Sequence, residues 1–461
     1  TLPLSPNGKF DRKALPVPVQ TRPELANTYV APRTPEETLL AEIWSQVLQV
    51  QPVGVRDHYF ELGGDSIRVI QMLARARQKG LHLTLEQVYK EQTIEKLVPY
   101  LRSTSIESSP ATGLQPFELV AVADRRKLPA DLEDAYPLAA LQEGMHFHCE
   151  LKPDSAMFHD IFSFKIVAAF DRPKLETGLH QLVSRHASLR TSFDFVHYRE
   201  PLQVVHREVR VPLTVEDLCH LTPDEQHTAL LAWFAAEKKR PYRWEEAPLV
   251  RFHVHVYGEQ RFQFIVSFHH IILDGWSLAV LLTELFQDYF SMLSGTRPAV
   301  SPLRARYRDF VALEKKAASS DEHRRFWGQK LADPTVSALP RWTKSMCKGG
   351  AEQVRGPEIF VPSTVLDGLK GLALSAGVPL RSVLHAAHMK VMSVVYGSSD
   401  VLSGLITNGR QEDLDAEQMI GLFLNAAPFR MQLTGGSWLE LYRQPFAAEQ
   451  GFGAGASALG G

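Results

Sequence analysis

The sequence predicts a multidomain chain in which a small all-α four-helix bundle precedes a larger α/β domain made of two halves. Three observations lead to this prediction. Apolar residues recur at helical spacing over residues 34–102, a stretch rich in serine and proline follows, and helical and strand-like segments then alternate. The length of 461 residues also favours several domains, because a single hydrophobic core rarely grows beyond ~250–300 residues.

The bulk composition is that of a globular protein. Hydrophobic residues make up 44% of the chain and charged residues 22%, and the net charge is −2. Binding to nucleic acid or to an anionic membrane therefore has no electrostatic support. No apolar run approaches the ~20 residues of a membrane span, and the N-terminus lacks a signal-peptide pattern. The three cysteines, Cys149, Cys219 and Cys347, form neither a disulfide framework nor a metal cluster, so we expect a cytoplasmic chain without a metal ion.

The N-terminal part is expected to be a tail followed by the bundle. Residues 1–33 are rich in proline and polar groups, which favours an extended tail or linker. Within residues 34–102, Thr34 can cap the first helix, with Pro35 at its first position and Glu37 in a capping box. A second helix follows "ELGGDS", and two shorter helices complete the bundle, the last one capped by Thr93.

The remaining chain divides into a linker and two α/β halves. Residues 103–131, with "STSIESSPATGLQP", are expected to be an interdomain linker. Residues 132–300 contain a helix at "PKLETGLHQLVSRHASLR", paired strands at "RFHVHVYG" and "RFQFIVSFHH", and a helix at "LAVLLTELFQDYFSML". Residues 301–461 contain helices at "YRDFVALEKKAASSDEHRRFWGQKL" and "VLHAAHMKVMSVVYG", strands at "DVLSGLIT" and "AAPFRMQL", and a glycine-rich tail.

The segment "ELGGDSIR" places Ser66 at the start of a helix. Gly63 and Gly64 allow a sharp turn there, and the common interpretation is that Asp65 or Ser66 caps the helix. The alternative is a covalent prosthetic arm on Ser66. A serine exposed on a bundle too small for a pocket is a suitable attachment point, and a helix N-terminus favours a phosphate.

The segment "VSFHHIILDGWS" ends an apolar run with two histidines. Adjacent strand residues face opposite sides, so one ring can point into a channel while the other packs into the fold. A histidine titrates near pH ~6.5, so His269 or His270 can accept or hold a proton at neutral pH. Gly275 leaves room for a substrate to approach the backbone.

Asp274, four residues after His270, needs a partner if it is buried as a carboxylate. The segment "SRHASLRTSF" offers Arg185 and Arg190 for this pairing. The alternative is that the histidine belongs to the core and Asp274 caps the helix that follows.

These motifs resemble those of nonribosomal peptide synthetases. "LGGDSI" resembles the motif of a peptidyl carrier protein, which implies that Ser66 carries 4′-phosphopantetheine. "LPLSPNGKFDRKALP" resembles the closing motif of an adenylation domain, which implies that such a domain precedes the carrier. Lys9 is the lysine of that motif, and without the body of the domain it is expected to have no role in substrate activation.

The run "HHIILDG" resembles the motif of condensation domains, whose fold has two chloramphenicol-acetyltransferase-like halves. "YPLAALQEGMHFH", "RHASLRTSF", "YRDFVALE" and "IGLFLNAAPFR" resemble further motifs of that domain and occur in the expected order. The resemblance implies a motif set of catalytic His270 with His269, Asp274 and Gly275, and a supporting set of Arg185, Arg190 and Asn425. Asp274 would pair with one of the two arginines.

The activity implied by the resemblance is amide-bond formation. A donor aminoacyl or peptidyl thioester on Ser66 would react with the amine of an acceptor on a downstream carrier protein, and a phosphopantetheinyl transferase would install the arm. Two alternatives share the fold: an epimerisation domain, and a non-catalytic recruiting or docking module. The histidine pair disfavours the second alternative.

The sequence also departs from the family pattern. A further His-x-x-x-Pro-Phe segment and the last strands of the second half are expected after "WLELYRQPFAAEQ" and are missing, so the second half is expected to be incomplete. "YPLAALQEGM" and Asp65 resemble the subclass that accepts a D-configured donor. Cys149 stands where the dual epimerising subclass has a second histidine, which disfavours dual function.

Overall fold

The computed structural model describes residues 22–103 apart from 24, 26, 65, 85–86 and 89–90, residues 114–296 apart from 154–155, and residues 302–333, 359–410 and 415–453. The tail with Lys9, the centre of the linker and the glycine-rich end lie outside the described residues. The chain forms two compact units. Of the described residues, the first unit comprises those within 22–103, 329–333, 359–403 and 428–453, and the second comprises those within 114–296, 302–328, 404–410 and 415–427.

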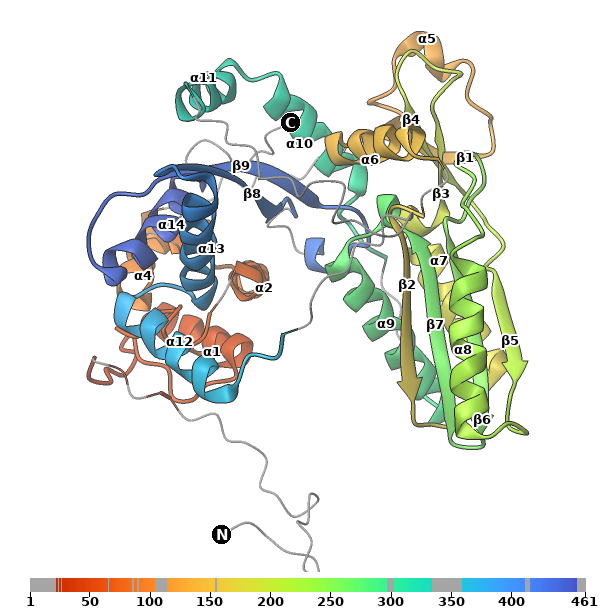
Figure 1. Ribbon diagram of the computed structural model, residues 1–461, viewed down its shortest axis with the longest axis horizontal. Helices are drawn as coiled ribbons and strands as arrows, with labels where there is room; N and C mark the ends of the chain where they lie inside the picture. Colours follow the sequence, from red (N-terminus) through yellow and green to blue (C-terminus); the bar gives the residue numbers. More distant parts are fainter. Residues whose placement is uncertain are drawn as a thin grey trace, which may run out of the picture. The chain divides into compact units, whose positions relative to one another are not determined.

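The predicted bundle lies in the first unit. Its described helices are α1 (Pro35–Leu48), α2 (Ser66–Gln78) and α4 (Ile94–Ser103) (Figure 1). The capping box at Thr34 is confirmed, because the backbone N–H of Glu37 donates to Thr34 Oγ1 and the Glu37 carboxylate accepts from the backbone N–H of Thr34. The core of the bundle contains Trp44, which packs edge-on against Tyr59 with a ring separation of 4.7 Å.

Three helices from the later chain belong to the same unit. They are α12 (Ser363–Ala376), α13 (Leu380–Tyr396) and α14 (Trp438–Gly453). Buried apolar residues of these helices share a core with the bundle, and Phe446 packs 5.6 Å from Phe60, edge to face. The sequence predicted a helix only in the region of α13, as part of a second α/β half over residues 301–461, and it predicted neither α12 nor α14 nor this packing.

A four-stranded sheet forms the centre of the second unit. Its strands, in the order of the sheet, are β2 (His159–Ile166), β7 (Arg261–His269), β6 (Val250–Gly258) and β5 (Leu213–Asp217). The predicted pairing of β6 with β7 is confirmed, and the pair is antiparallel; β5 adds in parallel to β6 at the edge.

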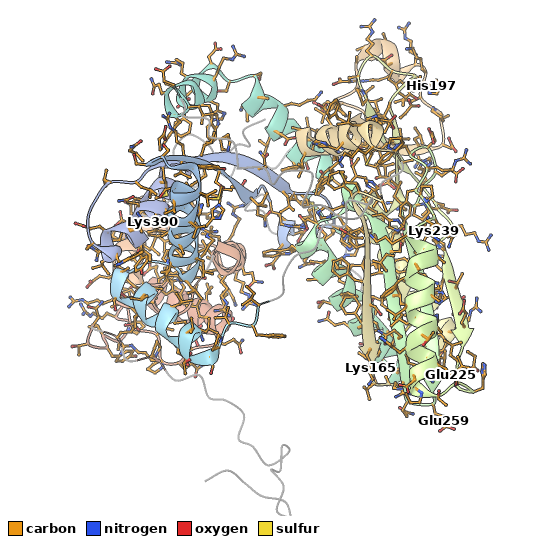
Figure 2. All side chains as sticks on the ribbon, viewed as in Figure 1. Lys165, His197, Glu225, Lys239, Glu259 and Lys390 are labelled. Atoms are coloured by element: carbon orange, nitrogen blue, oxygen red, sulfur yellow. The ribbon has the colours of Figure 1, made fainter. Side chains whose placement is uncertain are left out.

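Helices cover both faces of this sheet (Figure 1). They are α7 (Arg172–Arg185) and α9 (Gly275–Leu293) on one face, and α8 (Pro223–Glu237) on the other. Figure 2 shows that α8 runs along the sheet from Glu225, near the β6–β7 turn at Glu259, toward Lys239. Apolar side chains of β6 and β7 face α7 and α9, whereas the opposite face of these strands carries polar groups toward α8.

A second sheet in this unit joins β1 (Leu132–Pro137), β4 (Leu202–His206) and β3 (Thr191–Asp194), in the order β1-β4-β3. Both segments predicted as strands in this region are strands, β8 (Asp400–Asn408) and β9 (Leu424–Gln432). They pair with each other in a two-stranded sheet. The other described helices are α5 (Val122–Arg125), α6 (Ala140–Leu151), α10 (Tyr307–Ala318) and α11 (Asp321–Lys330).

Two expectations differ from the structure. The single helix expected from Tyr307 onward is two helices, because the Ser320 hydroxyl accepts from the backbone N–H of His323 and so favours a new helix start. The linker also ends earlier than residue 131: the backbone N–H of Leu114 donates to the Asp309 carboxylate, which ties residue 114 to the second unit. Among the described residues, no helix is long and apolar enough to span a membrane.

Candidate active site

The histidine pair lies at the end of β7. His269, the last residue of the strand, is 5% exposed, and its Nδ1 accepts from the backbone N–H of Ile271. Trp244 contacts the ring edge-on at 4.7 Å. Burial, together with the neighbouring His159 and His270, lowers the pKa of His269 to about 3. This ring is therefore neutral at physiological pH and packs as part of the fold.

His270 begins the short turn after β7 and is the more accessible ring of the pair, with 24% of its side chain exposed. Its backbone N–H donates to the carbonyl of Phe158 over 2.7 Å, which fixes the turn against the start of β2. The ring lies beside the same strand, because 3.5 Å separates His270 Nδ1 from Asp160 Oδ2. One ring of the pair packs inward and the other is more accessible, and the channel expected beside the accessible ring stays a prediction.

Asp274 is held from three sides. Its Oδ1 accepts from the backbone N–H of Ser277, so it caps α9, and its Oδ2 accepts from the backbone N–H of Phe423. Arg410 Nη2 donates to Oδ1 over 3.2 Å, and both side chains are almost fully buried. The cap and the buried ion pair therefore occur together, although the sequence analysis treated them as alternatives.

The expected pairing of Asp274 with Arg185 or Arg190 is wrong. Arg185 Nη1 lies 2.9 Å from Glu284 on α9, and Arg190 Nη1 lies 2.6 Å from Glu133. Both arginines are held at the C-terminal end of α7 and the turn after it, where other carboxylates neutralise them.

Arg410 is the arginine that pairs with Asp274, because the chain after β8 returns beside the start of α9. Its guanidinium also donates to the Ser277 hydroxyl and to the carbonyls of Ala416 and Met419. Burial lowers the pKa of Arg410, while the Asp274 carboxylate acts in the opposite direction. Neither Arg410 nor Asp160 lies in a motif, so the sequence predicted a role for neither residue.

Gly275 and Asn425 occupy different settings. A Cβ added at Gly275 would meet no described atom within 4 Å, so the space predicted beside this glycine is present. Asn425, on β9, is 6% exposed, and its Oδ1 accepts from the backbone N–H of Ala426. Asn425 thus shapes its own strand in the described structure.

Ser66 is the first residue of α2, as the sequence predicted. Gly63 before it has φ +91°, which favours glycine, and its carbonyl accepts from Arg68 Nη1. A Cβ at Gly64 would lie 2.3 Å from the ring of Tyr59, a distance that no real contact permits. The two glycines are therefore required by the turn that positions Ser66.

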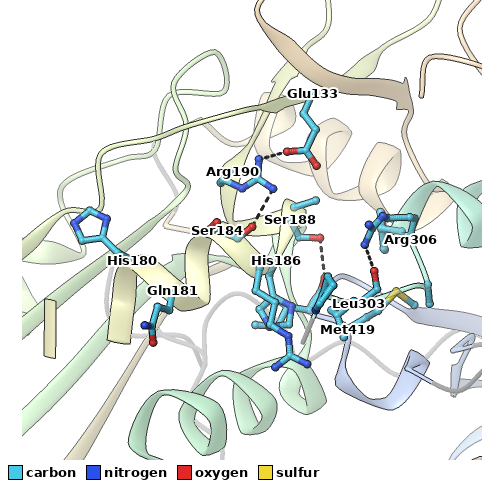
Figure 3. Close-up of a pocket in the computed structure, with 16 residues that line it drawn as sticks. Glu133, His180, Gln181, Ser184, His186, Ser188, Arg190, Leu303, Arg306 and Met419 are labelled. Atoms are coloured by element: carbon cyan, nitrogen blue, oxygen red, sulfur yellow. Dashed lines mark hydrogen bonds and ion pairs between the residues drawn. The ribbon is translucent and has the colours of Figure 1, made fainter. Parts of the chain in front are cut away.

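A cavity of about 690 Å³ opens in the second unit, and its lining does not include the histidine pair (Figure 3). Its lining includes Arg185, Arg190 and Arg306, but the first two are neutralised by Glu284 and Glu133. His270 and Asp274 do not line it. Neither residue of the motif therefore offers a side chain to this cavity.

Two family models match the chain. The model described as "Condensation domain" matches residues 132–443, which is more than half of the chain. The model described as "Phosphopantetheine attachment site" matches residues 38–101. These ranges agree with the order of domains that the motifs predicted.

Known proteins with similar sequences are large synthetases. The AMB antimetabolite synthetase AmbE of Pseudomonas aeruginosa is 36% identical over 93% of this chain and 20% of its own length. Tyrocidine synthase 2 of Brevibacillus parabrevis is 30% identical over 94% of this chain and 11% of its own length. The chain thus spans a fifth or less of these relatives.

A solved structure also resembles the chain. It is the first condensation domain of the calcium-dependent antibiotic synthetase in complex with a substrate analogue, which matches with a TM-score of 0.58. The match covers 71% of this chain and 76% of that chain at 19% identity, and it supports the fold alone.

Proposed function

This chain belongs to the condensation-domain family of nonribosomal peptide synthetases, and from that premise we propose that it transfers an acyl group from a carrier-bound thioester to an amine. The observation that carries the proposal is the accessible ring of His270 at the start of a loop that the buried contacts of Asp274 hold in place. Ser66, at the start of α2 in the same chain, would carry the thioester that donates the acyl group.

The residues around Ser66 fit a covalently bound 4′-phosphopantetheine. The serine stands at the N-terminus of a 13-residue helix, where backbone N–H groups and the helix dipole favour a phosphate. Gly63 and Gly64 keep the preceding turn tight. When bound, the group supplies a thiol on a long arm that holds the donor as a thioester. Ser66 would hold the arm through its side-chain oxygen.

In the proposed reaction, the acceptor nitrogen attacks the thioester carbonyl carbon, a C–N bond forms and the C–S bond breaks. The amine loses one proton and the departing sulfur gains one, so the balance needs no further reactant. His270 either accepts the proton from the amine or holds the amine in line for attack. Alignment of two reactants alone can lower a barrier by ~7–11 kcal/mol, so both roles remain part of the proposal.

The neighbours of His270 have supporting roles in this proposal. Asp274 and Arg410 hold the loop between β7 and α9, and His269 packs that loop into the fold. Gly275 leaves open space at the start of α9, which suits the approach of a substrate to the backbone. The proposed partners are an upstream adenylation domain, a downstream acceptor carrier protein and a phosphopantetheinyl transferase.

The function is tested by loading Ser66 with a defined aminoacyl pantetheine and adding an aminoacylated acceptor carrier. Intact mass should show the donor leaving this chain and appearing on the acceptor as an amide. His270→Ala should load normally and transfer slowly, and Ser66→Ala should not load. An inverted donor without transfer would instead indicate epimerisation. A folded, loaded chain that does neither would indicate a recruiting module.

A further inference from the structure

A cluster of possible metal ligands lies in the four-stranded sheet, outside the machinery of the proposed function. Glu216 on β5 and His253 and His255 on β6 each bring a donor atom within 4.8 Å of the others. We propose that these three side chains bind a divalent transition-metal ion of the zinc class. The expectation that the chain binds no metal ion rested on its cysteines alone.

The register of the sheet brings the three side chains together. In the parallel pair β5–β6, Glu216 is aligned with His255, and Thr214 is aligned with His253. Residues two apart on a strand share a face, so both histidines point to the side covered by α8. Trp233 of α8 stacks on the ring of His253 at 4.6 Å. The two imidazoles meet edge to face at 4.5 Å.

The ring of His253 is oriented as a metal ligand would be. Its Nδ1 lies 2.5 Å from Thr214 Oγ1, whereas its Nε2 is buried and has no hydrogen-bond partner among the described residues. If Nδ1–H donates to the hydroxyl, the lone pair of Nε2 is left without a partner in a side chain that is only 2% exposed. A hydrogen bond at one ring nitrogen that directs the other toward an ion is typical of metal-bound histidines.

His255 and Glu216 supply the other two ligands. His255 is fully buried, and its Nε2 lies 3.4 Å from Glu216 Oε2. Two ligands bound at ~2.0–2.1 Å in tetrahedral geometry are about 3.3–3.4 Å apart, so an ion fits between these atoms without moving them. The Glu216 side chain is 55% exposed, which gives the ion a route from solvent and leaves a fourth position for water.

The electrostatic surroundings suit a cation. Arg251 is the one cation among the described residues of β6 on the face that carries the two histidines. It is neutralised by Glu237 at 2.6 Å and lies over the ring of Tyr242.

Bound zinc would tie the edge strand β5 to β6, because its ligands come from both strands. The ion would therefore stabilise this sheet rather than take part in acyl transfer. The experiment uses the full chain, freed of metal with a chelator and then titrated with zinc chloride. We expect one zinc ion per chain, and a rise in Tm of about 5–10 °C at free zinc a hundredfold above the Kd. Cobalt(II) should give the visible absorption of a four-coordinate site.

Matched variants assign the ion to this site. Glu216→Gln and His255→Gln should each weaken zinc binding by at least about tenfold, since even changes to residues behind the ligands cost that much. The control variants are Glu259→Gln, in the exposed β6–β7 turn, and His227→Gln, on the exposed side of α8, and both should bind zinc as the wild type does. Because Glu216 is exposed, Glu216→Gln should fold. If the buried variant His255→Gln does not fold, zinc binding by Glu216→Gln decides the test.

The proposal is overturned if the wild-type chain binds no stoichiometric zinc. It is equally overturned if Glu216→Gln binds zinc with unchanged affinity and the same cobalt spectrum. Neither result depends on Ser66 loading or on acyl transfer, so the outcome is independent of the proposed function.

Discussion

Arg410 Nη2 lies 3.2 Å from Asp274 Oδ1, and neither side chain is more than 1% exposed. This ion pair joins the start of α9 to the chain that follows β8, two segments separated by 136 residues. The same carboxylate accepts from the backbone of Phe423 and caps α9 through Ser277. A carboxylate so enclosed must satisfy its oxygens within the protein, and these donors do so.

Removing Arg410 should destabilise the second unit. Arg410→Ala leaves Asp274 buried without its charged partner, and breaking a buried pair in this way costs about 3–5 kcal/mol. Asp274→Ala should have a similar effect, with loss of the helix cap added. Urea unfolding of each purified variant, followed by circular dichroism, measures the change in the free energy of unfolding.

The control variant is Arg185→Ala, which removes an arginine that pairs with Glu284 instead and is less buried than Arg410. In the double variant Asp274→Asn/Arg410→Met, part of the lost stability should return, because no buried charge is left alone. An Arg410→Ala chain as stable as the wild type would show that the ion pair does not hold this loop.

Ser66→Ala should abolish the mass increase caused by a phosphopantetheinyl transferase and coenzyme A, because Ser66 is the proposed attachment residue at the start of α2. Gly64→Ala should fold poorly in the bundle, since its methyl group would overlap the ring of Tyr59. Intact mass measures the first effect and thermal unfolding the second. Gly80→Ala is the control for the steric overlap in Gly64→Ala. A Cβ at Gly80 meets no described atom, although the φ of +79° there still favours glycine. Persistent modification of Ser66→Ala would contradict the assignment.

Asp160 should act as a positioning residue for His270. Its Oδ2 lies 3.5 Å from Nδ1 of the ring, so a carboxylate here can fix the ring's orientation while the other ring nitrogen remains free for the acceptor. Asp160→Asn should slow transfer without changing the loading of Ser66. The loss should be smaller than the ~10²–10⁴-fold that general acid–base catalysis supplies as a whole.

The informative comparison is single-turnover transfer with Asp160→Asn, Asp160→Glu and His270→Ala. Asp160→Glu should recover part of the transfer rate, because it keeps a carboxylate near the ring. If the role of Asp160 were only structural, both Asp160 variants should instead have an equally lowered Tm. In the double variant Asp160→Asn/His270→Ala, the two losses should not multiply, because Asp160 acts through the ring. Independent losses would contradict a positioning role.

Acid should destabilise the second unit because three of its histidines are buried as neutral rings. Burial is the main cause that lowers the pKa of His159 to about 4, and the pKa values of His253 and His269 to about 3. An unfolded histidine has a pKa of ~6.5, so the unfolded chain binds protons first as the pH falls. Stability is therefore lost below pH ~6.5, at about 1.4 kcal/mol per pH unit for each histidine.

Urea unfolding at pH 7, 6 and 5 in the presence of a chelator tests this prediction. Between pH 7 and pH 5 each ring should cost about 2 kcal/mol, so His159→Gln should show a shallower dependence on pH than the wild type. His227→Gln, an exposed histidine on α8, should leave the dependence unchanged. A free energy of unfolding that does not change over this range would show that these rings are not buried as neutral groups.

The sequence could predict contacts that are close along the chain, and it could not predict the distant ones. The spacing of His270, Asp274 and Gly275 indicated a strand end, a tight turn and a capped helix, because all three depend on neighbouring residues. Thr34 and Glu37 formed their capping box for the same reason.

The partner of Asp274 could not be predicted in this way. Arg410 meets Asp274 only because β8 and the chain after it return to α9, and "TNGRQ" carries no local signal of that return. The two histidines of the proposed metal site were visible as His-x-His in "RFHVHVYG". Glu216 joins them through the register of β5 on β6, which no local pattern indicates.

Cys149 lies where a second histidine would stand in the dual epimerising subclass, and its Sγ is 3.7 Å from His269 Nε2. Burial raises the pKa of the Cys149 thiol, with the neighbouring Glu150 acting in the same direction. The side chain is thus a neutral thiol against the inward-facing ring of the pair. It is a poor base for removing a proton from a donor α-carbon, so we expect no inversion by this chain.

The donor on Ser66 should therefore be used as it arrives, and we expect the D-form to be preferred. The resemblance of "YPLAALQEGM" to the D-accepting subclass motivates this choice. The physical reason is that an α-carbon of the wrong hand turns its side chain toward the wall beside His270, and a carbonyl displaced by ~1 Å can lose about a hundredfold in rate. The test loads Ser66 with the D- and L-forms of one donor and follows transfer to one acceptor by chiral analysis of the amide. Faster transfer of the L-form would reject the preference, and a D-product from the L-form would show that Cys149 does not prevent inversion.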